Sequence, residues 1–369
     1  MKILLSTITY YPTIGGADDF ARSIAEGLAA RGHEVAVATS DLLQHVSGKK
    51  LSNTKKTNLN GVEIIRSKSF NLPGHCYPFW PGLRRIIRRF KPDIVHAFNF
   101  GYFSVDGAAF LSQKLPLIIS PTGGRYRSGG MYDALKKVFE RRVLRANIWT
   151  ALSESERKSL RAEFPSAPRI EILSPSILPE EWKKISDDPF PDIPKNLRIL
   201  FAGRLSRDKG IDDLIEAMQK VNKKIDAELI VAGPNYGYEV GKIEDKHIHF
   251  LGALDREKLV AVFKHSDLVV LPSYHEGFGI VLIEAMAAGK PVIAYDNSSM
   301  PELARDGENG FCVKTGDTEA LADAIMKLND PLLRESYGNK GKEIVFREFN
   351  RQKMIDKVLE LYLTALALK

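Results

Sequence analysis

The order of secondary structure along the chain constrains its fold most, because short apolar strands alternate with helical segments through most of the 369 residues. The chain opens with an apolar strand at residues 2–7 and a turn-rich segment at 9–16. A helical pattern then ends at Gly32, before a second strand at 35–39. This alternation predicts parallel strands joined by helices. The composition, with 44% hydrophobic and 27% charged residues, excludes a disordered chain, a collagen and a coiled coil.

The alternation occurs twice. In the first half, further strand-like runs lie at 62–66, 94–97, 117–120, 148–152 and 170–173. A proline-bearing stretch at 174–196 follows, which we interpret as a linker. Beyond it we expect strands at 198–202, 228–232, 249–252, 268–271 and 291–295, and helices at 211–221, 256–264, 280–288 and 318–328.

This pattern predicts two Rossmann-like parallel α/β domains, residues 1–173 and 174–349, with a C-terminal helix at about 350–369 that crosses back to the first domain. We expect the two domains to face a central cleft. The cleft would lie at the carboxyl ends of the strands, where sheets of this kind bind ligands.

Charge is distributed unevenly around the net value of +7. Residues 1–186 contain 28 Lys and Arg against 16 Asp and Glu, a net charge of +12, whereas 187–369 contain 25 against 30, a net charge of −5. A positive first half could attract nucleic acid, an anionic lipid surface or an anionic small molecule. Base-stacking aromatic residues are not interleaved with the cations, so we predict no nucleic-acid partner.

A short basic segment at 82–91 has an amphipathic helical pattern. Its apolar residues share one face, and the other face would carry Arg84, Arg85, Arg88 and Arg89. A second basic stretch lies at 135–143, and aromatic residues precede the first one at Tyr77, Phe79 and Trp80. Basic and aromatic residues together favour an anionic membrane surface as a partner. The alternative is that the apolar stripes pack on the sheet and the arginines are solvated.

No apolar run reaches the length of a membrane span, and the first apolar run is too short for a secretory signal. We therefore expect a cytoplasmic chain that binds the cytoplasmic membrane face peripherally, if at all. The two cysteines and eight histidines have no metal-binding spacing, and the sequence contains no Asp-x-Asp. We predict neither a metal nor a cofactor.

The most informative residues follow two expected strands of the second half. The loop at 203–210 has Arg204 and Lys209, whose guanidinium and ammonium groups could together hold an anionic diphosphate. A solvated basic turn is the alternative.

The loop at 272–279 contains Glu276 and two glycines that open an apolar helix, where backbone amides could bind an anion or a hydroxyl. Within that helix, the expected buried carboxylate of Glu284 could accept hydrogen bonds from sugar hydroxyls, or pair with backbone amides or a neighbouring arginine.

These two loops resemble the motifs of the retaining glycosyltransferases of family 4, which have the GT-B fold. The matching motifs are Gly-Arg-(x)4-Lys-Gly at 203–210, Glu-Gly-Phe-Gly at 276–279 and Ala-Gly-x-Pro-Val-Ile-Ala at 288–294. Similar motifs continue upstream at 12–16, 31–35, 91–96 and 151–154. The resemblance spans nearly the whole chain in the expected order.

The resemblance implies a donor that is a nucleoside diphosphate sugar, held without a metal. Arg204 and Lys209 would bind its diphosphate, Glu284 its ribose hydroxyls, and Glu276 would lie near the transferred sugar. The other implied donor-binding residues are Gly15, Gly16, Gly203, Leu251, Gly277, Phe278, Gly279 and Ile280. Among them, Leu251 borders the nucleobase, and Gly15 and Gly16 approach from the first domain.

For the acceptor side, the resemblance suggests His96 and Asp106 as further catalytic candidates. Phe98 and Thr122 occupy places where the family often has histidine, so the acceptor chemistry departs from the family pattern. The acceptor would be a glycan, a lipid-linked molecule or a small molecule, as in polysaccharide biosynthesis. A nucleotide-sugar epimerase or a phosphorylase of the same fold, or a non-catalytic protein that binds an anionic ligand, are the alternatives. A dehydrogenase is disfavoured because no Gly-x-Gly-x-x-Gly follows the first strand.

Overall fold

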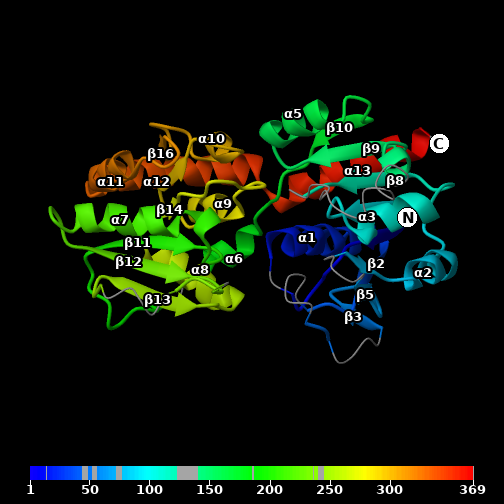
Figure 1. Cartoon of the computed structure of the whole chain (residues 1–369), viewed down its shortest axis with the longest axis horizontal. Coiled ribbons are helices and arrows are strands. Elements are labelled where there is room, and N and C mark those ends of the chain that lie inside the picture. The colour runs from blue at the N-terminus through cyan, green and yellow to red at the C-terminus, as the bar shows by residue number, and fades with distance from the viewer. Residues whose placement is uncertain are drawn as a thin grey trace. The chain divides into compact units, whose positions relative to one another are not determined.

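A computed structural model describes residues 1–13, 15–43, 49–51, 56–71, 77–122, 140–184, 187–235, 237–239 and 245–368. The chain divides into two compact units, one of Met1–Pro175 with Arg351–Lys369 and the other of Ser176–Asn350. The boundaries expected at residues 173 and 349 differ from this division by two residues and one residue. Each unit is a parallel sheet with helices packed on it (Figure 1).

The first unit has an eight-stranded sheet in the order β10-β9-β8-β7-β1-β2-β4-β3. Its strands are β1 (Lys2–Ser6), β2 (Glu34–Ser40), β3 (Thr57–Leu59), β4 (Val62–Ser67), β7 (Ile94–Phe98), β8 (Leu117–Ser120), β9 (Ile148–Ala151) and β10 (Arg169–Ile172). All neighbours pair in parallel except β3, which is antiparallel to β4 at the edge. A separate two-stranded sheet joins β5 (Phe70–Asn71) and β6 (Pro78–Phe79).

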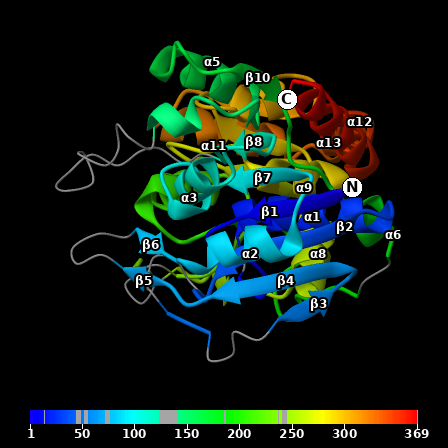
Figure 2. The same ribbon diagram turned by 90° about the vertical axis from the view of Figure 1, so that its right-hand side faces the viewer.

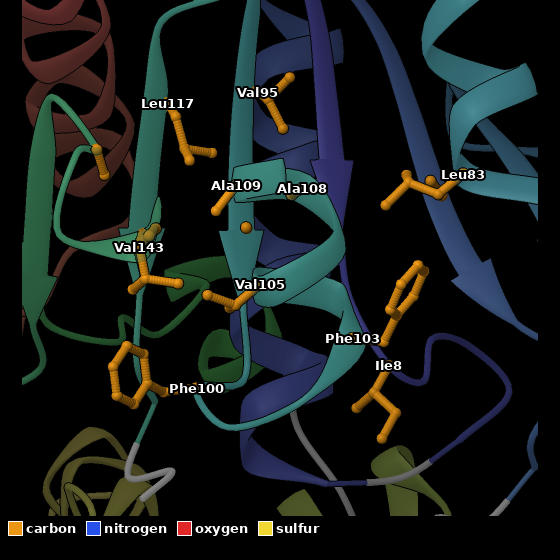
Figure 3. Close-up of a cluster of buried hydrophobic side chains, with 14 of the residues drawn as sticks. Ile8, Leu83, Val95, Phe100, Phe103, Val105, Ala108, Ala109, Leu117 and Val143 are labelled. Carbon is orange, nitrogen blue, oxygen red and sulfur yellow. The ribbon is translucent and has the colours of Figure 1, made fainter. Parts of the chain in front are cut away.

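Helices cover both faces of this sheet. On one face α2 (Gly82–Phe90) lies against β1, β2 and β4, and its neighbour α3 (Phe103–Leu111) lies against β7 and β8 (Figure 2). Figure 3 shows the core beneath them, where Leu83, Phe103 and Val105 lie with strand residues such as Val95. On the other face α1 (Gly16–Ala30) packs against α13 (Arg351–Ala367). The remaining helix described in this unit, α5 (Glu154–Glu163), packs on β9 and β10.

The second unit has a six-stranded sheet in the order β13-β12-β11-β14-β15-β16, and every pair is parallel. The strands are β11 (Leu197–Ala202), β12 (Ala227–Ala232), β13 (Ile248–Gly252), β14 (Leu268–Leu271), β15 (Val292–Tyr295) and β16 (Gly310–Val313). All residues of β11 and β12 are buried, as expected for strands covered on both faces.

The helices of the second unit also form two layers. On one face α7 (Ile211–Val221) packs against α11 (Thr318–Lys327), and both contribute to one apolar core with β11 and β12. On the other face α9 (Ile280–Ala287) packs against α12 (Pro331–Glu348), and α8 (Arg256–His265) lies against β11. The short elements are α6 (Pro179–Lys183), η1 (Arg207–Lys209) and α10 (Met300–Leu303). Aspartates cap α8, α11 and α12, where each side chain accepts a backbone N–H of the first turn.

The stretch at 174–196 is not a free linker, because most of it packs on the second unit. Trp182 of α6 is 6% exposed and contacts the ring of Phe263. The buried guanidinium of Arg198 binds the Asp188 carboxylate and the carbonyl oxygens of Phe190, Ile193 and Pro194. The prolines limit helix formation here, but the two apolar anchors, Trp182 and Phe190, fix the chain nonetheless.

Several short elements were not predicted, namely β3, β5, β6, β16, α6 and α10. β3, β5 and β6 have three residues or fewer, too few for hydrophobic periodicity to be recognised, and α6, α10 and β16 each contain a proline or a glycine that interrupts the pattern. Most of the second basic stretch, residues 135–139, falls outside the described part of the chain. Among the helices that the structure describes, none combines the length and apolar composition needed to cross a membrane.

Candidate active site

The two loops singled out in the second half follow neighbouring strands. Residues 203–210 leave the carboxyl end of β11 and residues 272–279 leave that of β14, and these strands pair in parallel. Gly210 brings the loops into contact, because a Cβ built on it would lie only 1.9 Å from the carbonyl oxygen of Pro272. Its φ of 68° also favours glycine.

The cations of the first loop have different environments. Lys209 is 9% exposed, and its Nζ donates a hydrogen bond of 2.7 Å to Oε1 of Glu276. The same oxygen accepts from the Ser273 hydroxyl at 3.0 Å. Arg204 is exposed, with its Nη2 3.9 Å from Oδ2 of Asp208. The structure therefore joins Lys209 directly to Glu276 and leaves the guanidinium of Arg204 accessible at the same sheet edge.

The N terminus of α9 forms the next part of the site. Gly279 caps this helix with a φ of 87°, and a Cβ on it would lie 2.5 Å from the Met300 side chain. The first N–H groups of a helix have no intrahelical acceptor and carry a partial positive charge, so Ile280 at the first helical position, next to the cap residue Gly279, presents a donor suited to an anion. Gly277 lies two residues before the cap, in the loop. Phe278 is 4% exposed and its ring packs on Phe349, so only its backbone could contribute to binding.

Glu284 lies in the second turn of α9 and is 7% exposed. Its carboxylate accepts a hydrogen bond from Arg256, the first residue of α8, and Arg256 also binds Glu181 at 2.8 Å. The sequence left open whether the Glu284 carboxylate binds sugar hydroxyls or pairs with a protein donor. In the structure it pairs with a protein donor, the guanidinium of Arg256. Leu251 lies near the carboxyl end of β13, five residues before Arg256, at the same edge of the sheet.

The sequence analysis did not identify Arg256, because no motif around this residue indicates a pair with Glu284. A usable signal was available: the expected helix at 256–264 begins directly after an expected strand, so its first residue lies at the carboxyl edge of the sheet. Ser273 was missed for a different reason, since its hydroxyl partner depends on how the loop closes around Glu276.

Gly15 and Gly16 belong to the first unit, where they begin α1. The backbone of Gly15 is extended, with a φ of 179°, and a Cβ there would lie 3.1 Å from Oδ2 of Asp18. The structure thus places these two glycines at a helix N terminus, in a different unit from the other donor-binding candidates.

His96 is fully buried in β7. Its Nδ1 is 2.9 Å from the Tyr362 hydroxyl of α13 and its Nε2 is 2.7 Å from the Ser120 hydroxyl. Burial lowers the pKa of His96 to about 3, so the ring is neutral at physiological pH. Both nitrogens are occupied within the core, which gives His96 a structural position between the sheet and α13.

Asp106 is also fully buried, in the first turn of α3. Its Oδ2 accepts a hydrogen bond of 2.8 Å from the Tyr77 hydroxyl. Phe103 and Val105, which precede it, belong to the apolar cluster in Figure 3. Asp106 and His96 belong to the first unit, whereas the loops of Lys209 and Glu276 belong to the second.

The basic face of α2 forms as predicted. Leu83, Ile86 and Phe90 are buried, and the exposed residues of the helix are Arg84, Arg85, Arg88 and Arg89. The aromatic residues differ from the expectation, because Tyr77 is 8% exposed and Trp80 is fully buried against Phe103. Phe79 is 40% exposed, and its cross-strand partner Phe70, which was not anticipated, is 60% exposed.

Among the residues that the structure describes, no group of three or more His, Cys, Asp or Glu side chains is arranged to hold a metal ion.

Two family models match consecutive parts of the chain. The model for glycosyltransferase family 4 matches residues 14–181, and the model for group 1 glycosyl transferases matches residues 184–344. An uncharacterized glycosyltransferase of Methanocaldococcus jannaschii is 27% identical over 99% of this chain and 99% of its own length. The N-acetyl-alpha-D-glucosaminyl L-malate synthase of Bacillus anthracis is 24% identical over 98% of this chain and 97% of its own.

Solved structures are similar over the whole chain. Sucrose-phosphate synthase from Thermosynechococcus elongatus has a TM-score of 0.81 and 20% identity, covering 100% of this chain and 99% of its own. HepE of Anabaena, solved in complex with UDP, has a TM-score of 0.73 and 19% identity, covering 98% and 99%. HepE has also been solved with UDP-glucose. These likenesses confirm the expected GT-B fold.

Proposed function

This chain belongs to the family 4 and group 1 glycosyltransferases, and we propose that it transfers a sugar from a nucleoside diphosphate sugar with retention of the anomeric configuration. The observation that carries the proposal is the contact between Lys209 and Glu276, at the sheet edge that also carries Arg204 and the N terminus of α9. HepE, which binds UDP and UDP-glucose, supports a uridine diphosphate sugar as the first donor to test.

In this proposal, positive charge stabilises the departing diphosphate. Lys209 and Arg204 bind its oxygens, and the amides at the start of α9 donate to the same group. Negative charge grows on the diphosphate as the bond to the sugar breaks, so donors already fixed around it lower the barrier to transfer. No metal ion is required for this step.

Glu276 and Glu284 have separate proposed roles. Glu276 shares its Oε1 with Lys209 and Ser273, and would orient the transferred sugar through its carboxylate. Glu284 would accept hydrogen bonds from the ribose hydroxyls, with Arg256 holding its carboxylate in place. Leu251 would border the nucleobase.

Retention is proposed to follow from attack on the same face of the sugar that the diphosphate leaves. The acceptor hydroxyl oxygen forms the new bond to the anomeric carbon while the bond to the diphosphate oxygen breaks. The acceptor proton passes to that phosphate oxygen, so no protein base is needed. The protein contributes orientation and charge stabilisation.

The test uses labelled UDP-, GDP- and ADP-sugars with glycan, lipid-linked and small-molecule acceptors. Lys209→Met and Arg204→Met should each lower kcat/KM by about 100-fold or more, because each removes a fixed cation beside the leaving group. Arg207→Met is the matched control, since Arg207 is an exposed cation of the same loop, and its activity should stay within about twofold.

Near-normal turnover in both Lys209→Met and Arg204→Met would contradict the proposal. Isomerised nucleotide sugar in place of a transferred one would indicate an epimerase, and binding without turnover would indicate a ligand-binding protein. Turnover that survives EDTA is expected, and complete loss of activity in EDTA would contradict the metal-independent mechanism.

We also propose that α2 and the β5–β6 hairpin form a surface for anionic lipid. The four exposed arginines of α2 could each contribute ~1 kcal/mol near a charged membrane. The exposed rings of Phe70 and Phe79 pair across the hairpin and suit the interfacial region. A nearby membrane would fit a lipid-linked acceptor.

Vesicle flotation tests this surface. The protein should float with phosphatidylcholine vesicles that contain phosphatidylglycerol and not with pure phosphatidylcholine. Replacing Arg84, Arg85, Arg88 and Arg89 with glutamine should abolish flotation, whereas glutamine at the exposed Lys223 and Lys224 of the second unit should not. Equal flotation of both variants would argue against the surface.

A further inference from the structure

The carboxylate of Asp213 joins three elements around the proposed diphosphate site. Asp213 lies in the first turn of α7, four residues after Lys209. Its Oδ2 accepts two hydrogen bonds, from the Tyr274 hydroxyl at 2.7 Å and from the Tyr295 hydroxyl at 2.6 Å. Tyr274 belongs to the loop of Glu276, whereas Tyr295 is the last residue of β15.

The two tyrosines differ in their surroundings. Tyr295 is fully buried, whereas Tyr274 is 47% exposed. Their rings contact each other edge to face, with centroids 5.8 Å apart. The hydrogen bond to Asp213 raises the pKa of Tyr274, and burial with the same hydrogen bond raises that of Tyr295. Both hydroxyls therefore remain protonated donors at physiological pH, and the shared carboxylate remains their acceptor.

Further contacts join the same two segments. The Tyr274 N–H donates to the carbonyl oxygen of Asp208 at 3.0 Å, and Lys209 binds Glu276 at 2.7 Å. The loop at 272–279 is thus held against residues 208–213 at three points. The Tyr274 hydroxyl makes one of these contacts, and it connects an exposed side chain of the loop to Asp213 of α7.

We propose that Asp213 and Tyr274 are positioning residues that fix the spacing between the Lys209 loop and the Glu276 loop for binding a diphosphate. The inference rests on the proposed function. Lys209 and the amides of the Glu276 loop must approach phosphate oxygens at hydrogen-bond distance, and a shift of one loop would lose contacts to the outer phosphate. Tyr295 donates to the same carboxylate from the end of β15, outside both loops, so it does not join one loop to the other.

The experiment compares two variants that each remove one hydroxyl from the same carboxylate oxygen, Tyr274→Phe and Tyr295→Phe. Binding of UDP, GDP and ADP, and of the matching monophosphates, is measured by calorimetry, together with the melting temperature. For the diphosphate that the wild type binds, Tyr274→Phe should weaken binding about tenfold and leave the monophosphate within about twofold. Its melting temperature should stay near that of the wild type, because Tyr274 is half exposed.

Tyr295→Phe should show the opposite pattern, with a lower melting temperature and diphosphate affinity close to that of the wild type, because its hydroxyl lies in the buried strand end. Unchanged diphosphate affinity in Tyr274→Phe would overturn the inference. So would an equal loss for diphosphate and monophosphate, or identical behaviour of the two variants. If the wild type bound none of the three diphosphates, the proposed function itself would be wrong and this inference with it.

Discussion

Asp18 is a buried acid whose replacement should stabilise the first unit. It lies in the first turn of α1 and is 9% exposed. Its Oδ1 accepts a hydrogen bond of 2.7 Å from the Thr9 hydroxyl, and Oδ2 faces Gly15. Burial raises the pKa of Asp18 from 3.8 to about 6, against the opposing effect of the Thr9 hydrogen bond and with a small contribution from the charge of Asp19.

The magnitude follows from proton linkage. Below pH 3.8 both the folded and the unfolded state hold the proton, so the group has no effect on stability. Between 3.8 and about 6 the unfolded state ionises and the folded state does not, and the cost to folding grows until it is complete above about pH 6. Each unit of difference between the pKa of Asp18 in the folded and unfolded states is worth about 1.4 kcal/mol, so this cost reaches about 3 kcal/mol. Asp18→Asn resembles the protonated acid and should recover up to that amount near neutral pH.

Urea unfolding measures this gain. A Trp182→Phe background leaves Trp80 and Trp149, both buried in the first unit, as fluorescent reporters. Asp18→Asn should be more stable than its parent by about 3 kcal/mol at about pH 8, and the gain should shrink as the pH falls toward about 4. Asp19→Asn is the control, because its side chain is 53% exposed, and it should change stability by about 0.5 kcal/mol. A loss of stability at pH 8, or a gain independent of pH, would refute the reasoning.

Other positions give simpler expectations. His96→Asn should destabilise the fold by about 2–4 kcal/mol, because it disrupts two buried hydrogen bonds. The kcat of the folded fraction should stay unchanged, and a loss of kcat with an unchanged melting temperature would instead make His96 catalytic. Gly279→Ala should lower the melting temperature more than Gly307→Ala, since both have positive φ but only Gly279 has a neighbour in the way; equal losses would argue against the clash. Arg256→Met should weaken UDP binding by about tenfold in calorimetry, because Glu284 loses its partner, and unchanged affinity would remove Arg256 from the site.

The architecture was largely predictable because its signals are local. The strands of the second unit are continuous apolar runs, as in β11, and they recur between helical segments, which gives a parallel sheet without any knowledge of contacts. The loops of Lys209 and Glu276 were recognisable because glycines and charged residues directly follow expected strands. Parallel strands bring such loops to one edge.

What escaped prediction depends on contacts between distant residues. Arg256 reaches Glu284 from another helix, and Asp213 binds two tyrosines from two other elements. Trp80 resembles an interfacial residue in the sequence, yet it is buried, because α3 supplies Phe103 to cover it. Sequence periodicity assigns a residue to a face of its own element and carries no information about which side chain from elsewhere completes that face.

The return of α13 to the first unit affects how the chain is made. Tyr362 lies beside His96, so the ribosome must finish the second unit before the first can close its core. Residues 176–350 emerge as one uninterrupted stretch and can fold while synthesis continues. The first unit, in contrast, lacks α13 beside α1 on one face of its sheet until synthesis ends. A chain truncated near residue 350 would contain every element of the second unit but an incomplete core in the first.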